Sequence, residues 1–121
     1  MHAERHVVTL TTDADGAATG YTPVVTGRVL QIHYVKTDYA DGVDVAVTSE
    51  ATGQTIWEET NVNAAAIRPT RQLTYTTTGS SIAYAATFGV YEPITVANDR
   101  VKIVVASGGD TKTGAFHVVI G

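Results

Sequence analysis

The residues that most invite a chemical interpretation lie in a glycine-rich stretch near the C-terminus. This stretch, Gly108 to Gly114, reads GGDTKTG and contains a lysine followed by a threonine. A phosphate-binding loop needs the pattern G-x-x-x-x-G-K-[ST] and a helix after it, whose first amide groups point at the phosphate. Here Thr111 precedes Lys112, and the following AFHVVI is typical of a strand. We interpret the stretch as a hairpin turn and not as a nucleotide site.

Acidic residues and histidines are the residue types in this sequence that could bind a metal ion. DADG, residues 13–16, resembles the start of a calcium loop but lacks the remaining ligands. Asp38, Asp41 and Asp44 recur at a spacing of three, which does not place them on one face of a strand. We interpret these acids as turn residues, with a Ca²⁺ site in the 36–42 loop as the less favoured alternative. The histidines would form a site only if packing brought them together, because they lack metal-ligand spacing; they are His2, His6, His33 and His117.

The sequence indicates binding rather than catalysis. It has no cysteine, no G-x-S-x-G nucleophile elbow and no recognisable pair of carboxylates, so we expect no enzyme activity, no catalytic residue, no metal and no cofactor. Five side chains are candidates for an interaction surface: Trp57, Tyr84, Tyr91, His2 and Arg5. The aromatic ones could stack on a sugar, although aromatic residues on strands more often belong to a core or a subunit interface.

Composition narrows the class of protein. The 121 residues carry 8 Lys+Arg and 12 Asp+Glu, a net charge of −4. The basic residues are scattered, so nucleic-acid binding is not expected. No stretch approaches the roughly 20 apolar residues of a membrane span, and the N-terminus does not resemble a signal peptide. We expect a protein made in a cytoplasm that does not enter membranes.

The residue types also predict an all-β fold. Twenty Thr and seventeen Val stand against three Leu and one Met, and β-branched residues suit a pleated sheet. Thr-Gly pairs punctuate the chain as turns. We predict one domain over residues 1–121, an antiparallel β-sandwich or jelly roll of about eight strands, with residues 1–6 as a flexible arm. Strands are expected near 5–12, 28–35, 43–50, 54–59, 71–77, 82–88, 94–97, 100–107 and 114–120.

Two hairpins and one helical turn are expected within this fold. Alternating apolar residues predict a hairpin of 43–50 with 54–59 and another of 100–107 with 114–120. The last pair is apolar on both faces, which favours a central position or cover by a partner. Asn63 to Ile67 is predicted as a helical turn, and 76–93 as a loop or a strand that docks on another subunit. The expected core comprises Leu10, Val29, Val45, Val47, Val101, Ile103, Val105, Phe116, Val118 and Ile120.

Two segments resemble a family of small proteins encoded among the virion genes of tailed bacteriophages. They are DGVDVAVTSEATGQTIWEETN (41–61) and ITVANDRVKIVVASGGDTKTGAFHVVIG (94–121), with Arg68-Pro69 as a further match in a variable middle. The resemblance implies a structural part of the particle, namely a head decoration (cement) protein that binds the major capsid protein of the same phage on the capsid surface. It carries over no catalytic residue. A tail or fibre component and a carbohydrate-binding module are the alternatives.

Low surface charge and strands with two apolar faces lead us to expect a homo-oligomer, either a dimer or a trimer. Its contact region is expected at 76–93 and the final strand.

Overall fold

The structure, a computed structural model, describes residues 2–85 and 88–121, with only the backbone at residues 84, 85 and 88. This part of the chain is all-β, as predicted, and it contains no helix that is long and apolar enough to cross a membrane. Twelve strands follow one another: β1 (Glu4–Thr11), β2 (Ala18–Tyr21), β3 (Val25–Val35), β4 (Val43–Ser49), β5 (Thr55–Val62), β6 (Ala66–Pro69), β7 (Arg71–Leu73), β8 (Ala83–Ala85), β9 (Phe88–Gly89), β10 (Tyr91–Asp99), β11 (Val101–Ala106) and β12 (Thr113–Ile120).

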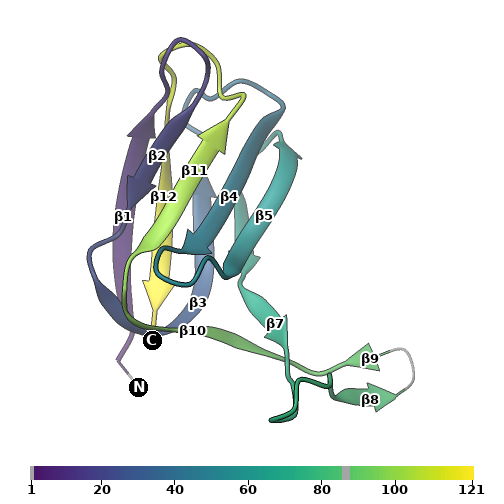
Figure 1. Ribbon diagram of the computed structural model, residues 1–121. Coiled ribbons are helices and arrows are strands. Elements are labelled where there is room, and N and C mark those ends of the chain that lie inside the picture. The colour runs from purple at the N-terminus through teal and green to yellow at the C-terminus, as the bar shows by residue number, and fades with distance from the viewer. Residues whose placement is uncertain (1, 86–87) are drawn as a thin grey trace.

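Ten of these strands form two antiparallel sheets that pack as a sandwich (Figure 1). The six-stranded sheet has the order β1-β12-β3-β10-β7, with β6 also beside β3. The four-stranded sheet has the order β2-β11-β4-β5, and β8 pairs with β9 outside the sandwich. The sandwich is confirmed, with two short strands, β2 and β6, beyond those expected.

The core lies between the two sheets. Along β4 and β12 buried and partly exposed residues alternate without interruption, because successive side chains of a strand point to opposite faces. All ten residues predicted for the core are buried, and eight further aliphatic residues join them: Val8, Val25, Ile32, Val43, Ile56, Val62, Ile94 and Val96.

The C-terminal hairpin is not formed. β11 and β12 lie in opposite sheets, and residues 107–112 cross between them. The crossing places β11 between β2 and β4 and β12 between β1 and β3, so both strands are central in their sheets, as their two apolar faces require. The prediction of a central position is confirmed, and the prediction that the two strands pair is wrong.

The glycine-rich stretch is a turn. Gly109 and Thr111 have positive φ angles of 90° and 54°, and strand β12 begins at Thr113. A strand follows where a phosphate-binding loop would need a helix, which agrees with the rejection of a phosphate-binding loop, whereas the turn joins strands of two sheets and does not close the expected hairpin.

The hairpin of β4 and β5 is formed as predicted, with Gly53 in the turn at a φ of 73°. Its register contains a β-bulge: Val47 faces Trp57 and Thr48 faces Thr55, so Ile56 is an extra residue. The bulge lets both Ile56 and Trp57 turn inward, and they are 5% and 8% exposed. Alternation alone would have placed one of them outside.

The helical turn predicted at Asn63 to Ile67 is wrong. Ala66 to Pro69 form strand β6, which pairs with the C-terminal half of β3. The long strand β3 has 11 residues, and β10 covers only the first half of this edge, which leaves hydrogen-bonding groups for β6 to meet. Pro69 is accommodated because it lies at the end of an edge strand.

The N-terminal arm is shorter than expected. Strand β1 begins at Glu4, and residues 4 to 6 pair with Ile120, Val119 and Val118 of β12. The expectation of a flexible arm over 1–6 is therefore wrong for residues 4 to 6, because the edge of the central strand β12 offers them ladder partners. His2 and Ala3 precede the strand.

Candidate interaction site

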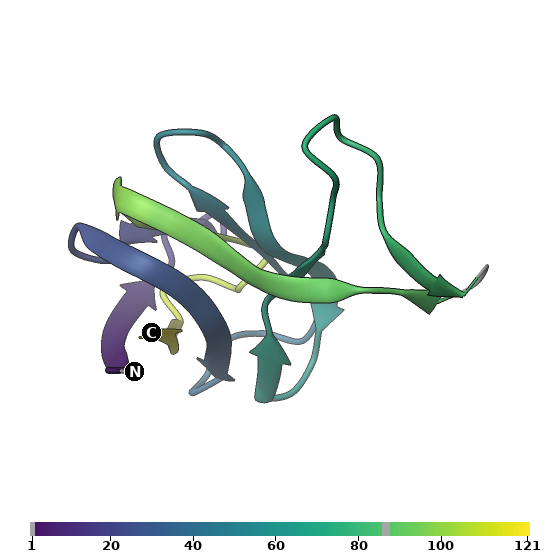
Figure 2. The same ribbon diagram turned by 90° about the horizontal axis from the view of Figure 1, so that it is seen from below.

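A projecting arm, which comprises residues 74–85 and 88–91 of the described chain, leaves the sandwich where β7 and β10 meet and carries β8 and β9 at its end (Figure 1). Figures 1 and 2 show it extending away from both sheets in two perpendicular views. It occupies the segment for which the sequence left open a loop or a docking strand. The arm is the part of the described fold that extends beyond the two sheets.

Backbone hydrogen bonds hold the arm together. The amide of Ile82 donates to the carbonyl of Thr74 at 2.8 Å, and the amide of Thr74 donates to the carbonyl of Val90 at the same distance. The amide of Val90 in turn donates to the carbonyl of Ile82 at 3.3 Å. These bonds join three short segments into a ribbon without using side chains.

The base of the arm is fixed to the sandwich. Leu73 pairs with Tyr91, and Gln72 pairs with Glu92, where β7 meets β10. Gln54, in the turn after β4, donates its amide Nε2 to Gln72 Oε1 at 2.7 Å. The arm is therefore anchored at its base while its far end has no second layer beside it (Figure 2).

Apolar side chains on the arm face solvent. Tyr75 is 50% exposed and Tyr91 is 61% exposed, and Ile82 and Val90 are 39% and 38% exposed. Such side chains gathered on one segment mark a contact surface more strongly than apolar residues scattered over a protein. Tyr91, a residue singled out from the sequence, belongs to this group, whereas the side chain of Tyr84 lies outside the described part of the structure.

Trp57 belongs to the core and not to an interaction surface. Its ring lies 6.3 Å from Tyr34 and 6.5 Å from Phe116, measured between ring centroids. Its indole Nε1 donates to Glu59 Oε1 at 3.1 Å. The burial that follows from the β-bulge removes Trp57 from the residues available to stack on a sugar.

Glu59 also ties β6 to β5. Arg68 donates from Nε to Glu59 Oε1 at 2.7 Å and from its terminal nitrogen to Oε2 at 3.0 Å, a bidentate pair. These hydrogen bonds from Arg68 lower the pKa of the Glu59 carboxyl below its ordinary value. Arg68, which belongs to the Arg68-Pro69 match in the family resemblance, therefore links strand β6 to strand β5.

His2 and Arg5 are both exposed; His2 precedes the edge strand β1, and Arg5 lies on it. The Nε2 of His2 lies 3.6 Å from a carboxylate oxygen of Glu4. The structure does not bring these two residues near the projecting arm, since β1 and β7 are the opposite ends of the six-stranded sheet. Of the candidates named from the sequence, Trp57 thus lies in the core, His2 and Arg5 lie at the N-terminal edge, and Tyr91 lies on the arm.

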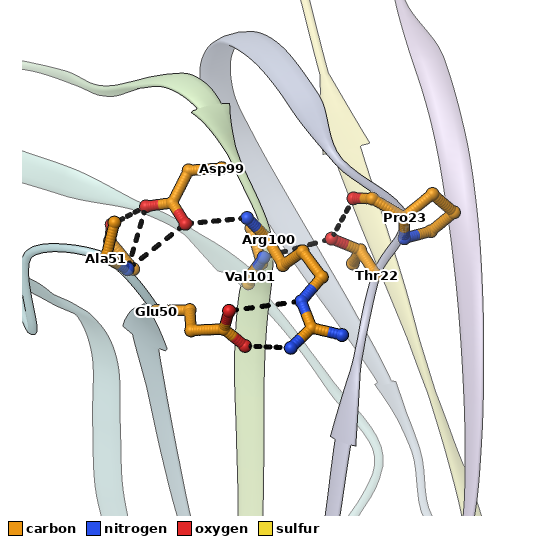
Figure 3. A network of polar contacts seen from close by, with 8 residues as sticks. Thr22, Pro23, Glu50, Ala51, Asp99, Arg100 and Val101 are labelled. Atoms are coloured by element: carbon orange, nitrogen blue, oxygen red, sulfur yellow. Dashed lines mark hydrogen bonds and ion pairs between the residues drawn. The ribbon is translucent and has the colours of Figure 1, made fainter.

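A polar network closes the end of the sandwich where β10 leads into β11 (Figure 3). The Asp99 carboxylate accepts hydrogen bonds from the amides of Arg100 and Ala51, at 2.7 and 3.1 Å, and from the hydroxyl of Ser49. The Ser49 hydrogen bond is the main reason that the pKa of Asp99 is lowered. This buried carboxylate is occupied in joining the β4–β5 turn to β11.

Arg100 extends the network to the surface. Its guanidinium is paired with the Glu50 carboxylate, with Nε 3.2 Å from Oε1 (Figure 3). The guanidinium also lies 4.1 Å from the centroid of the Tyr21 ring. Thr22 accepts a hydrogen bond from the amide of Val101 at 3.0 Å. These contacts tie β2, β4 and β11 together.

Two of the aspartates considered as metal ligands, Asp13 and Asp38, accept hydrogen bonds from backbone amides. Asp13 Oδ1 accepts hydrogen bonds from the amides of Asp15 and Ala17, at 2.9 and 3.1 Å. Asp38 accepts from the amide of Thr113 at 2.6 Å. This is the structural role that the sequence favoured for them. Over residues 2–85 and 88–121, no group of three or more His, Asp or Glu is placed to hold a metal ion.

Comparisons with known proteins add a distant structural likeness to this description. No protein-family model and no curated protein matches the chain. Among solved structures, the fold is similar to a chain in the cryo-EM structure of the giant freshwater prawn Macrobrachium rosenbergii extra small virus (XSV) VLP, with a TM-score of 0.38 and 11% sequence identity over 98% of this chain and 78% of that chain. A likeness this distant does not assign a function.

Proposed function

We propose that this chain is a structural protein of a virus particle, and that it decorates the capsid of a tailed bacteriophage. The observation that carries the proposal is the projecting arm with its exposed tyrosine and aliphatic side chains. The partner would be the major capsid protein of the same phage. After synthesis in the host cell the protein would sit on the capsid surface, with a binding role and no catalytic one.

The physical argument starts from the stability of the arm. A short ribbon outside a sandwich is marginally stable in water, because it has no second layer in which to bury its apolar side chains. Docking on a shell would remove Tyr75, Ile82, Val90 and Tyr91 from water. Each contact is small, but a symmetric shell presents it many times, so that particle-wide attachment is strong and specific.

The segments that carry the family resemblance belong to the sandwich and not to the projecting arm. Residues 41–61 correspond to β4 and β5, and residues 94–121 to β10, β11 and β12, which build the sandwich. The projecting arm falls in the variable middle between them. A shared framework with a variable attachment segment suits proteins that dock on different shells.

A homo-oligomer, dimer or trimer, remains part of the proposal, with a changed contact region. Both edges of the final strand β12 are already paired, with β1 and β3. It therefore offers no edge for a further strand to join, and the arm is the better surface for contact between copies on a shell.

The proposal is tested by binding to capsids assembled without this chain. Tyr75→Ser and Tyr91→Ser should each weaken co-sedimentation with such capsids about tenfold or more, since exposed tyrosines of this kind become buried anchors. Val24→Ser is the matched control, because Val24 is an apolar residue of the sandwich that is 59% exposed. Unchanged binding by both tyrosine variants would refute docking through the arm.

A carbohydrate-binding module is the second candidate, and the exposure of Tyr75 and Tyr91 favours it. Tyrosine rings stack on sugar faces as well as on protein. Titration of the chain with soluble glycans, followed by NMR, separates the two functions. Sugar binding that is lost in Tyr91→Ala, together with no affinity for capsids, would favour the module.

A further inference from the structure

Two histidines that are far apart in the sequence lie side by side in the six-stranded sheet. His33 on β3 and His117 on β12 are directly opposite each other in the antiparallel register. Their ring centroids are 6.5 Å apart and the ring planes differ by 34°. The flanking Ile32 and Val118 face the core, so both imidazoles lie on the outer face of this sheet, where they are half-buried.

The separation suits two ligands of one ion. Opposite residues on paired strands have Cβ atoms about 4.5–5.5 Å apart, which is within reach of a shared metal. Imidazole nitrogens bind Zn²⁺ at about 2.0–2.1 Å, so ring centroids around a tetrahedral ion lie about 5 Å apart. The rings therefore need to close by about 1.5 Å, which partly exposed side chains on a rigid sheet can do by rotation.

The surroundings favour ligation. Val7 lies opposite His117 and Ile67 lies opposite His33, so an exposed apolar side chain flanks the pair on each side. A shallow groove of about 470 Å³ lies on the β6 side of His33, where it is lined in part by His33, Val35 and Ile67. The side-chain amide nitrogen of Gln31 lies 3.0 Å from His33 Nε2 and donates to it, so an ion bound through Nε2 takes the place of this hydrogen bond.

We propose that His33 and His117 together bind a divalent transition-metal ion of the Zn²⁺ and Cu²⁺ class as a pair of imidazole ligands. Imidazole is a preferred ligand of these ions, whereas Ca²⁺ and Mg²⁺ prefer oxygen. Two protein ligands leave the other coordination positions to water or another donor. The site is thus open, unlike the closed four-ligand sites that hold zinc fingers together.

The experiment uses the full chain without a polyhistidine tag and Zn²⁺ as the probe. Titration followed by NMR of the imidazole nitrogens should show one Zn²⁺ per chain, with the shifts confined to His33 and His117. His33→Asn and His117→Asn should each weaken Zn²⁺ binding at least about tenfold, because a single imidazole remains. Circular dichroism of both variants should match that of the wild type, since both side chains lie on the outer face.

His2→Asn and His6→Asn are the matched controls. Both residues lie near the N-terminus, and His6 turns to the other face of the sheet from His117. These variants should bind Zn²⁺ as the wild type does. No Zn²⁺ binding by the wild type, or loss of binding in a control variant with folded His33→Asn and His117→Asn unaffected, would overturn the proposal.

Discussion

Replacing Tyr34 and Tyr39 by phenylalanine, one at a time, should affect stability differently although the two rings lie in one cluster. The rings are stacked with centroids 6.3 Å apart, and the residues are 1% and 3% exposed. Tyr39 donates its hydroxyl to the carbonyl of Leu10 at 2.7 Å. The hydroxyl of Tyr34 is buried and finds no hydrogen-bond partner among the described residues.

The magnitudes follow from these contacts. Tyr39→Phe removes a buried hydrogen bond and should cost about 0.5–1.5 kcal/mol in the free energy of unfolding. Tyr34→Phe removes a hydroxyl that was desolvated without compensation, so it should be neutral or stabilise by as much as about 1 kcal/mol. Both changes keep the aromatic ring, so packing against Phe116, whose ring centroid lies 5.2 Å from that of Tyr34, is retained.

Urea unfolding of the wild type and both variants at neutral pH measures the difference directly, provided that the three m-values agree. The expected order of midpoints places Tyr39→Phe lowest and Tyr34→Phe at or above the wild type. A loss of more than about 1 kcal/mol in Tyr34→Phe, with little change in Tyr39→Phe, would refute the assignment of the hydrogen bond.

Two further predictions concern packing and pH. Ile103→Ala, at a fully buried site, should cost about 2–5 kcal/mol by urea unfolding, whereas Ile67→Ala, at a residue 57% exposed, should cost under about 0.5 kcal/mol; equal effects would show that the faces are misassigned. Burial raises the pKa of Tyr34 and of Tyr39 to about 12, above the unfolded value of 10.0. The contribution of their protonated hydroxyls to the free energy of unfolding is therefore complete below pH 10 and should be lost as the pH rises from 10 to 12. The hydrogen bond from Ser49 is the main reason that the pKa of Asp99 is lowered in the folded protein. The ionised Asp99 therefore contributes to the free energy of unfolding above its unfolded pKa of 3.8, and this contribution is lost as the pH falls through its folded pKa. Asp99→Asn should flatten the acid side of a stability–pH curve and leave the alkaline side as it is.

The sequence was most informative where the periodicity of two is strict. Val45 and Val47 alternate with Asp44, Ala46 and Thr48, and both lie in the core as expected. Pairing was harder to predict, because alternation shows which face is buried but not which strand lies alongside. The two apolar faces of β11 and β12 suited a hairpin as well as central positions in opposite sheets.

Local irregularities account for most of the other differences. A single extra residue at Ile56 turned Trp57 into the core, and a β-bulge leaves no mark in the alternation of so short a segment. Strand β6 was missed since Ala66 to Pro69 contain little β propensity, and their pairing depends on the free half of the edge of β3. The proximity of His33 and His117 follows from strand register, which no spacing along the chain encodes.

The arm illustrates what residue types can indicate about a site. Glycine, serine and small apolar residues between Thr76 and Pro93 marked the segment as irregular and a candidate for docking, and it projects from the sandwich (Figure 1). Exposure of Tyr91 could not be distinguished from burial by sequence, since an aromatic residue on a strand suits either environment.

If the proposed function is correct, counting copies of this chain in purified particles of its phage tests the central claim most directly. Quantitative mass spectrometry, with the major capsid protein as the internal standard, gives the ratio of the two chains. Decoration of a symmetric shell predicts hundreds of copies per particle. A count of about six to a few dozen would contradict decoration and favour a tail component with the lower symmetry of a tail, and no copies at all would contradict a role in the particle.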